Sequence, residues 1–284
     1  MNQEFIVASI DNYHFNDSRI KKLTVFLPDR EKIISDMKRE DLSQETDSGK
    51  KPLIWAAGGG TYILGGRYIP LIQRSADSLT NPDKLTIATG LSNTYEEMVD
   101  PLLLIRELFE EIIIMDREKN LYIPLFSDTD IPEHKELNRI ARESITASAS
   151  AVGLSWSNLR FVKARLEHRL LLDEIEVFYD HSRKTRSGLI HLDALSGRVN
   201  ILYAVHIIEL NELTHLYFYD TETKINSVGS FIPLSREVFL LDFEKNTLLN
   251  AKTKEPVRDR VILKTPHAEQ MIVHLKKILK ENYG

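Results

Sequence analysis

Residues 102–115, LLLIRELFEEIIIM, form an apolar segment that nevertheless carries four charged residues within six positions. When the segment is placed on a helix, at about 100° per residue, Glu107, Glu110 and Glu111 fan across one face. The opposite face carries apolar residues at spacings of 3, 4 and 3: Leu102, Ile105, Phe109 and Ile112. This pattern predicts an amphipathic helix whose apolar stripe packs into a core and whose other face presents carboxylates.

The flanking residues predict where this helix begins and ends. Asp100 is a favourable N-cap, and Pro101 suits the first helical position because its missing N–H needs no partner there. We expect the helix to run to about Met115, followed by a polar closing segment, DREKN. Arg106 precedes Glu110 by four residues, which is the spacing of an ion pair along a helix.

Three clustered carboxylates repel one another, and either solvent or a divalent cation can offset that repulsion. Mg²⁺ prefers carboxylate and water oxygens and commonly bridges substrate phosphates. On helical spacing alone, a solvated acidic face paired with Arg106 is the favoured interpretation, because exposed charge clusters on helices are common.

Short apolar runs on both sides of the helix predict strands. Residues 52–75, PLIWAAGGGTYILGGRYIPLIQRS, contain three apolar runs separated by glycines. Gly65–Gly66 between two such runs predicts a hairpin turn, because both glycines can adopt positive φ. We assign the earlier glycines, 58–60, to a turn as well, since no Gly-Lys-Ser/Thr follows as in a phosphate-binding loop. Residues 84–90 and 121–126 are also predicted strands.

The residues around the predicted helix are arranged as in a known family. GLSNTYE at 90–96, followed by RELFEE at 106–111, resembles the Nudix box of nucleoside-diphosphate-X hydrolases. Nine residues separate the two parts where the family has seven, so Glu96 and Glu97 compete for the upstream glutamate position. Ile113 occupies the position of the glycine that normally ends the family's helix, and we therefore expect the helix to continue beyond it.

The resemblance implies an α/β fold, specifically a Nudix-like α/β/α sandwich with a mixed sheet. The resemblance covers residues 52–126 and returns at 198–245, where ILYAVHIIEL and FIPLSREVFLL look like the later strands. It implies a Nudix-like domain made of residues 51–126 and 198–284. Residues 1–50 are then an N-terminal extension. Residues 127–197 are interpreted as a largely helical insertion or subdomain, which includes an amphipathic helix predicted at 132–151.

By resemblance, the reaction is hydrolysis of a phosphoanhydride bond in a nucleoside-diphosphate-linked substrate, with Mg²⁺ or Mn²⁺ as cofactor. The implied metal ligands are Glu107, Glu110 and Glu111, together with the backbone carbonyl of Gly90. Glu107 and Glu111 are also candidate catalytic residues, as is Arg106, which would orient a glutamate. In the family a further acidic ligand usually comes from a later strand or loop, and three candidates stay open here: Asp220, Glu222 and Glu209.

Basic side chains outside the helix are the candidate contacts to a nucleotide-like substrate. Arg74 ends the last apolar run of the hairpin region. Arg183 and Arg186 lie in a basic loop at 181–188 that could grip a phosphate, although a solvated loop is the commoner explanation for such charges.

The composition of the chain limits the classes of partner and the cellular location that we expect. The chain has 37 basic and 42 acidic residues, and its net charge of −5 argues against nucleic acid or an anionic membrane as the main partner. It contains no cysteine, which excludes disulfides and zinc–thiolate sites. Because no apolar run approaches 18 residues and no leader-like segment opens the chain, we expect a cytoplasmic protein outside the membrane. Members of the family often pair, so a homodimer is also implied.

Two other functions remain open at this level. The longer spacing and the missing glycine suit a catalytically weak Nudix-like module that binds or senses a nucleotide without turning it over. The large segments outside the resemblance suit an interaction protein with an accidental match. That last hypothesis predicts that the acidic face of the helix lies open to solvent.

Overall fold

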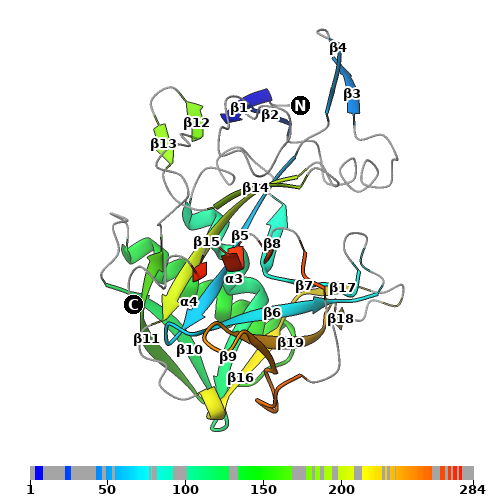
Figure 1. Cartoon of the computed structure of the whole chain (residues 1–284). Coiled ribbons are helices and arrows are strands. Elements are labelled where there is room, and N and C mark those ends of the chain that lie inside the picture. The colour runs from blue at the N-terminus through cyan, green and yellow to red at the C-terminus, as the bar shows by residue number, and fades with distance from the viewer. Residues whose placement is uncertain are drawn as a thin grey trace.

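Figure 1 presents the fold as a computed structural model of the whole chain. The structure describes the backbone of residues 4–8, 23–26, 43–46, 49–52, 55–76, 78, 82–91, 101–127, 134–167, 177–180, 183–185, 189–193, 198–207, 213–225, 228, 231–233, 235–257, 263–265, 268–269, 271–273 and 275–276.

A twelve-stranded sheet organises the chain, and it is mixed. Most neighbouring strands are antiparallel, but two of the pairs are parallel. The main path in spatial order is β16 (Leu216–Asp220), β9 (Ile112–Asp116), β10 (Asn120–Phe126), β11 (Asn158–Glu167), β15 (Arg198–Ile207), β5 (Trp55–Leu64), β6 (Tyr68–Arg74), β19 (Ser235–Asp242) and β20 (Thr247–Asn250). Three strands pair beside this path, on β15, β6 and β5 respectively: β14 (Leu189–Asp193), β7 (Leu85–Thr86) and β8 (Ala88–Leu91).

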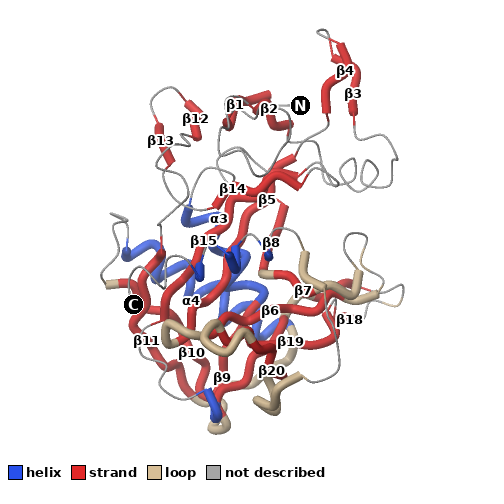
Figure 2. Tube along the Cα trace, in the orientation of Figure 1, coloured by secondary structure: helices blue, strands red, loops and turns tan. Residues whose placement is uncertain are grey.

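The remaining described strands form four two-stranded pairs. They are β1 (Glu4–Ala8) with β2 (Leu23–Phe26), β3 (Ser43–Thr46) with β4 (Gly49–Pro52), β12 (Val177–Asp180) with β13 (Arg183–Thr185), and β17 (Thr223–Ile225) with β18 (Phe231–Pro233). Figure 2 shows how strands dominate the described secondary structure.

Two α-helices pack against each other beside the sheet, α3 (Pro101–Glu111) and α4 (His134–Ala151). The short 3₁₀ helix η1 (Leu213–His215) leads into β16, and the described residues among 268–276 are helical. Within the described residues, no helix combines the length and the apolar character needed to cross a membrane. The fold is therefore mixed α/β, as predicted.

The two faces of the central strands belong to different hydrophobic cores. Tyr62 and Leu64 of β5 lie in the core that contains α3 and α4, whereas Ile63 between them lies in a second core. The second core also holds Met271 and Leu275 from the C-terminal helical residues. Alternate residues of a strand point to opposite faces, so helical segments cover this part of the sheet on both sides.

Several predicted elements are confirmed. The hairpin turn between β5 and β6 has φ of 56° at Gly65 and 69° at Gly66, and the Arg67 N–H donates to the Leu64 carbonyl at 3.1 Å. The predicted strand at 121–126 corresponds to β10, and the predicted helix at 132–151 corresponds to α4. The helix is amphipathic, as predicted, because its buried apolar residues recur at helical spacing: Leu137, Ile140, Ala141, Ile145 and Ala149.

The turn predicted at glycines 58–60 is wrong, because all three lie inside β5. They pair with β15 on one side and with β8 on the other. A Cβ added to Gly59 would lie 2.0 Å from the Ala88 carbonyl oxygen. The glycines therefore allow a close approach of β8, which is a tertiary requirement and not a turn. The predicted strand at 84–90 is divided, since β7 pairs with β6 and β8 pairs with β5.

The prediction that the helix continues to about Met115 is also wrong. It ends at Glu111, and residues 112–116 form β9. This strand is buried between β10 and β16, and three β-branched isoleucines in a row favour a strand at such a position. The chain thus passes directly from helix α3 into strand β9, with no intervening turn.

The interpretation of 127–197 as largely helical is wrong for the described residues. That range contains α4 but also four strands: β11, β12, β13 and β14. Two of them, β11 and β14, pair with β15 within the central sheet. The division of the chain at residues 51, 127 and 198 stays a prediction.

Candidate functional site

The C-terminal end of α3 lies where two sheet strands meet. Glu111 is the last residue of the helix, and β9 begins with the next residue. β16 pairs antiparallel with β9, and this register places Asp220 opposite Ile112. The chain leaving β16 must therefore pass beside the helix end, and this brings residues 220–222 to the carboxylates of α3.

Thr221 fastens this chain segment to the helix. Its N–H donates to the Glu111 carbonyl at 2.9 Å, and its hydroxyl donates to the Glu110 carbonyl. The last carbonyls of a helix lack partners within the helix, so these two bonds satisfy groups that would otherwise need water. Beside them, the Glu222 N–H donates to Oδ1 of Asp220 at 2.9 Å. The positions of Asp220 and Glu222 relative to Glu111 are therefore fixed by the backbone.

Glu111 is the buried carboxylate at the centre of this arrangement, with 8% of the residue exposed. Its pKa is raised well above the usual value, first because burial disfavours the charged form. The negative charges of Glu222, Asp220 and Glu107 raise the pKa of Glu111 further, in that order, while Arg74 lowers it. Four acidic side chains and one arginine thus interact electrostatically at one place, and they come from three separate segments of the chain.

Gly90 in β8 lies against the side chain of Glu107. A Cβ added to Gly90 would lie 2.0 Å from Oε2 of Glu107, and φ at Gly90 is not in the left-handed region. The glycine is therefore needed for space and not for backbone freedom. The sequence placed both residues in one motif, and the structure brings them into contact.

Arg106 lies on the more exposed side of the same helix and pairs with two of its glutamates. Its Nε lies 3.0 Å from Oε1 of Glu110, which confirms the predicted ion pair, and its Nη2 lies 3.7 Å from Oε1 of Glu107. The side chain of Glu110 is 40% exposed, and that of Glu107 is 23% exposed. Glu110 is thus paired with Arg106 near the surface, whereas Glu111 is enclosed.

The structure brings together five of the predicted site residues or open candidates with Glu111: Glu107, Gly90, Arg74, Asp220 and Glu222. Arg183 belongs to β13, but its side chain lies outside the described residues. The other predicted positions that lie outside them are Glu96, Glu97, Asp100, Arg186 and Glu209. Thr221 was not predicted, and no sequence motif marks it, because its role depends on the pairing of β16 with β9.

The donor atoms at this site suit a hard divalent cation by their chemistry. All four acidic groups present oxygen ligands, which are the donors that Mg²⁺ and Mn²⁺ take. The mutual repulsion at Glu111 is the kind that a cation would relieve. Across the described part of the chain, however, no three His, Asp or Glu side chains already have the arrangement of a metal site.

The interaction-protein hypothesis predicted an acidic face open to solvent, and Glu111 does not meet that prediction. Comparisons with known proteins identify no family. Neither the protein-family models, nor the curated proteins, nor the solved structures give a match to this chain.

Proposed function

We propose that the chain is a Nudix-type hydrolase that cleaves a phosphoanhydride bond in a nucleoside-diphosphate-linked substrate with the help of Mg²⁺ or Mn²⁺. The observation that carries the proposal is the convergence of Glu107, Asp220 and Glu222 on the buried Glu111. Burying charged carboxylates together is unfavourable unless a counter-charge compensates. A site that binds a divalent cation and a phosphate chain would explain why these carboxylates lie together.

The residues have separate roles in this proposal. Glu107, Glu111 and one or both of Asp220 and Glu222 hold the cation, and the Gly90 backbone carbonyl is a further candidate ligand. When bound there, the cation supplies neutralisation of phosphate charge and a more acidic water. Arg74 contacts a substrate phosphate, and Arg106 orients Glu107 and Glu110 from the exposed side. A carboxylate that does not bind the cation accepts the proton of the attacking water. The cytoplasmic location and the homodimer stay predictions.

A second function, a nucleotide-binding module with weak or no turnover, is favoured by one observation. The helix passes straight into β9 at the position of the family's closing glycine, so the end of the motif departs from the active pattern. Such a module would bind metal and nucleotide at the same carboxylates and release little product.

Turnover measured with and without metal tests the proposal. We expect release of phosphate or a nucleoside monophosphate from at least one substrate in a nucleotide panel when Mg²⁺ is present, and none with EDTA. Glu111→Gln removes a ligand charge while preserving side-chain size, and we expect at least an approximately 100-fold loss of turnover. The matched control is Glu143→Gln on α4, whose side chain is 60% exposed and lies in a different charge cluster.

Full activity of Glu111→Gln would contradict the proposal. Stabilisation of the wild type by metal and nucleotide without any turnover would support the binding module instead. Absence of both turnover and nucleotide-dependent stabilisation would remove both functions.

A further inference from the structure

A hollow of about 400 Å³ lies between α4 and β11, and none of its lining residues belongs to the acidic site. Its volume is within the range of small-molecule sites. β11 contributes Phe161, and the exposed face of α4 contributes most of the rest: Lys135, Asn138, Arg139, Arg142 and Glu143.

The strand side of the hollow is an exposed aromatic ring. Phe161 is 50% exposed, whereas the next residue, Val162, is 6% exposed. A half-exposed phenylalanine offers a flat apolar surface on which another ring can stack. The hollow therefore has an apolar wall that suits a planar ligand.

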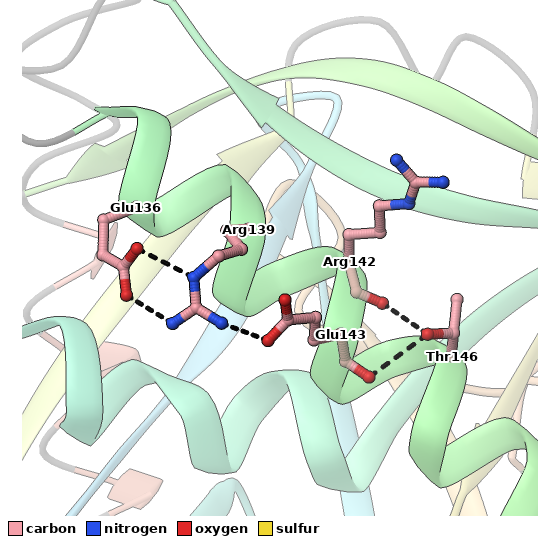
Figure 3. Close-up of polar contacts among 5 residues, drawn as sticks. All are labelled: Glu136, Arg139, Arg142, Glu143 and Thr146. Atoms are coloured by element: carbon pink, nitrogen blue, oxygen red, sulfur yellow. Dashed lines mark hydrogen bonds and ion pairs between the residues drawn. The ribbon is translucent and has the colours of Figure 1, made fainter.

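The α4 side of the hollow carries two cationic side chains, Lys135 and Arg142, whose surroundings differ from those of Arg139. Arg139 is bonded to Glu136, with its Nε 2.8 Å from Oε2, and also to Glu143. In Figure 3 the guanidinium of Arg142 points away from this cluster. Within the described residues, neither the Arg142 nor the Lys135 side chain has a carboxylate partner. Two cationic groups are thus available to a ligand.

The other polar side chains that line the hollow already have bonding partners within the protein. The side-chain amide of Asn138 makes two hydrogen bonds with the backbone of Phe126. Its oxygen accepts from the Phe126 N–H at 2.7 Å, and its nitrogen donates to the Phe126 carbonyl at 3.1 Å. The Thr146 hydroxyl donates to the carbonyl of Arg142 at 2.7 Å (Figure 3). The groups left for recognition are therefore one aromatic face and two positive charges.

We propose that this hollow binds an aromatic anion of the nucleoside monophosphate class, with the base stacked on Phe161 and the phosphate bound by Arg142 and Lys135. The size of the hollow favours a small molecule over a polymer. Arginine and lysine both suit phosphate oxygens, and arginine can contact two of them at once. The site needs no metal, so it is independent of the function proposed for the acidic site.

Calorimetric titration with adenosine monophosphate in the presence of EDTA tests the site, because EDTA removes metal-dependent binding to the carboxylates. Arg142→Gln removes a charged contact, and we expect at least about tenfold weaker binding. Phe161→Ala removes the stacking surface, and we expect at least about fivefold weaker binding. Both side chains are exposed, so both variants are expected to fold.

Matched controls come from the same and the neighbouring strand. Arg160→Gln changes an exposed arginine next to Phe161 that does not line the hollow, and Leu125→Ala truncates a 40% exposed apolar side chain on β10. Both controls should bind like the wild type. The proposal is overturned if the wild type shows no saturable binding or if Arg142→Gln and Phe161→Ala bind as it does. It is also overturned if inorganic phosphate binds as tightly as adenosine monophosphate.

Discussion

Helices α3 and α4 both carry clustered charges at helical spacing, but the two clusters have opposite surroundings. On α4, Glu136, Arg139 and Glu143 have side chains that are 42%, 52% and 60% exposed, and they bond to one another along the helix (Figure 3). On α3, Glu111 is only 8% exposed, and its neighbours are carboxylates. On α4 both carboxylates share an arginine in solvent, whereas on α3 a buried carboxylate lies beside other carboxylates.

The difference arises from what covers each helix. The charged face of α3 lies against β8 at Gly90 and against the segment after β16, which Thr221 fastens to the helix end. The charged face of α4 lines an open hollow with Phe161. Helical spacing alone favoured a solvated face for α3, and only the covering strands distinguish its carboxylates from an ordinary surface cluster.

Among substitutions that compare the two helices, the largest difference in effect is expected between two glycines, Gly90 beside α3 and Gly153 after α4. Gly90→Ala would place a Cβ where the Glu107 carboxylate lies. The obstructing group is the end of a flexible side chain, so we expect Glu107 to move, turnover to fall at least about tenfold, and the melting temperature to change little. The measurements are turnover with Mg²⁺ and thermal unfolding.

Gly153→Ala is the matched control after α4. Gly153 has φ of 72° and open space around it, so the substitution strains the backbone without touching a side chain. We expect a loss of about 1–2 kcal/mol in the free energy of unfolding and unchanged turnover. Full activity in Gly90→Ala would show that the position of Glu107 does not matter and would weaken the distinction between the helices.

An intermediate effect is expected in the pH dependence of stability, with opposite signs for the two clusters. The pKa of Glu111 is raised by burial and by Glu222, so above about pH 4.5 the folded state retains a proton that the unfolded state has lost. This carboxyl therefore lowers the free energy of unfolding as pH rises. In EDTA, Glu111→Gln should be more stable than the wild type at pH 8, and the difference should shrink towards pH 4.

Glu136 should behave in the opposite way. Its hydrogen bonds with Arg139 lower the pKa of Glu136, so its contribution to stability is present above about pH 4.5 and is lost as pH falls through the lowered value. Any stability lost in Glu136→Gln at neutral pH should disappear in acid. Urea unfolding of both variants between pH 3 and pH 8 measures the two trends. Parallel trends would contradict the electrostatic difference between α3 and α4.

The sequence predicted best the features that depend on neighbouring residues. The hairpin turn at Gly65–Gly66, the buried face of α4 and the ion pair between Arg106 and Glu110 follow from local conformation and helical periodicity. Residues 112–115 were wrongly joined to the helix, because a short, continuously apolar run fits a helix end and a buried strand equally well.

Features that depend on contacts between distant segments could not be predicted from local sequence patterns. Glycines 58–60 look like a turn until β8 is known to pack closely against β5. Asp220 and Glu222 were two of three open candidates, and only the pairing of β16 with β9 brings them to Glu111. Thr221 had no signal in the sequence, since its hydrogen bonds join two chain segments that no motif connects.

The smallest expected effects come from removing the arginine of each cluster. Arg139→Gln breaks bonds between exposed side chains, where solvent screens the charges, so we expect the melting temperature to stay within about 2 °C of the wild type and turnover to be unchanged. Arg106 is 31% exposed and contacts Glu107 of the acidic site and the neighbouring Glu110, so Arg106→Gln should let both glutamates shift. We expect turnover to fall roughly threefold to tenfold, because the carboxylates remain but lose an orienting partner. Thermal unfolding and turnover of the two variants in parallel measure the contrast. Equal effects of the two substitutions would mean that Arg106, like Arg139, belongs to a solvated surface and has no part in the site.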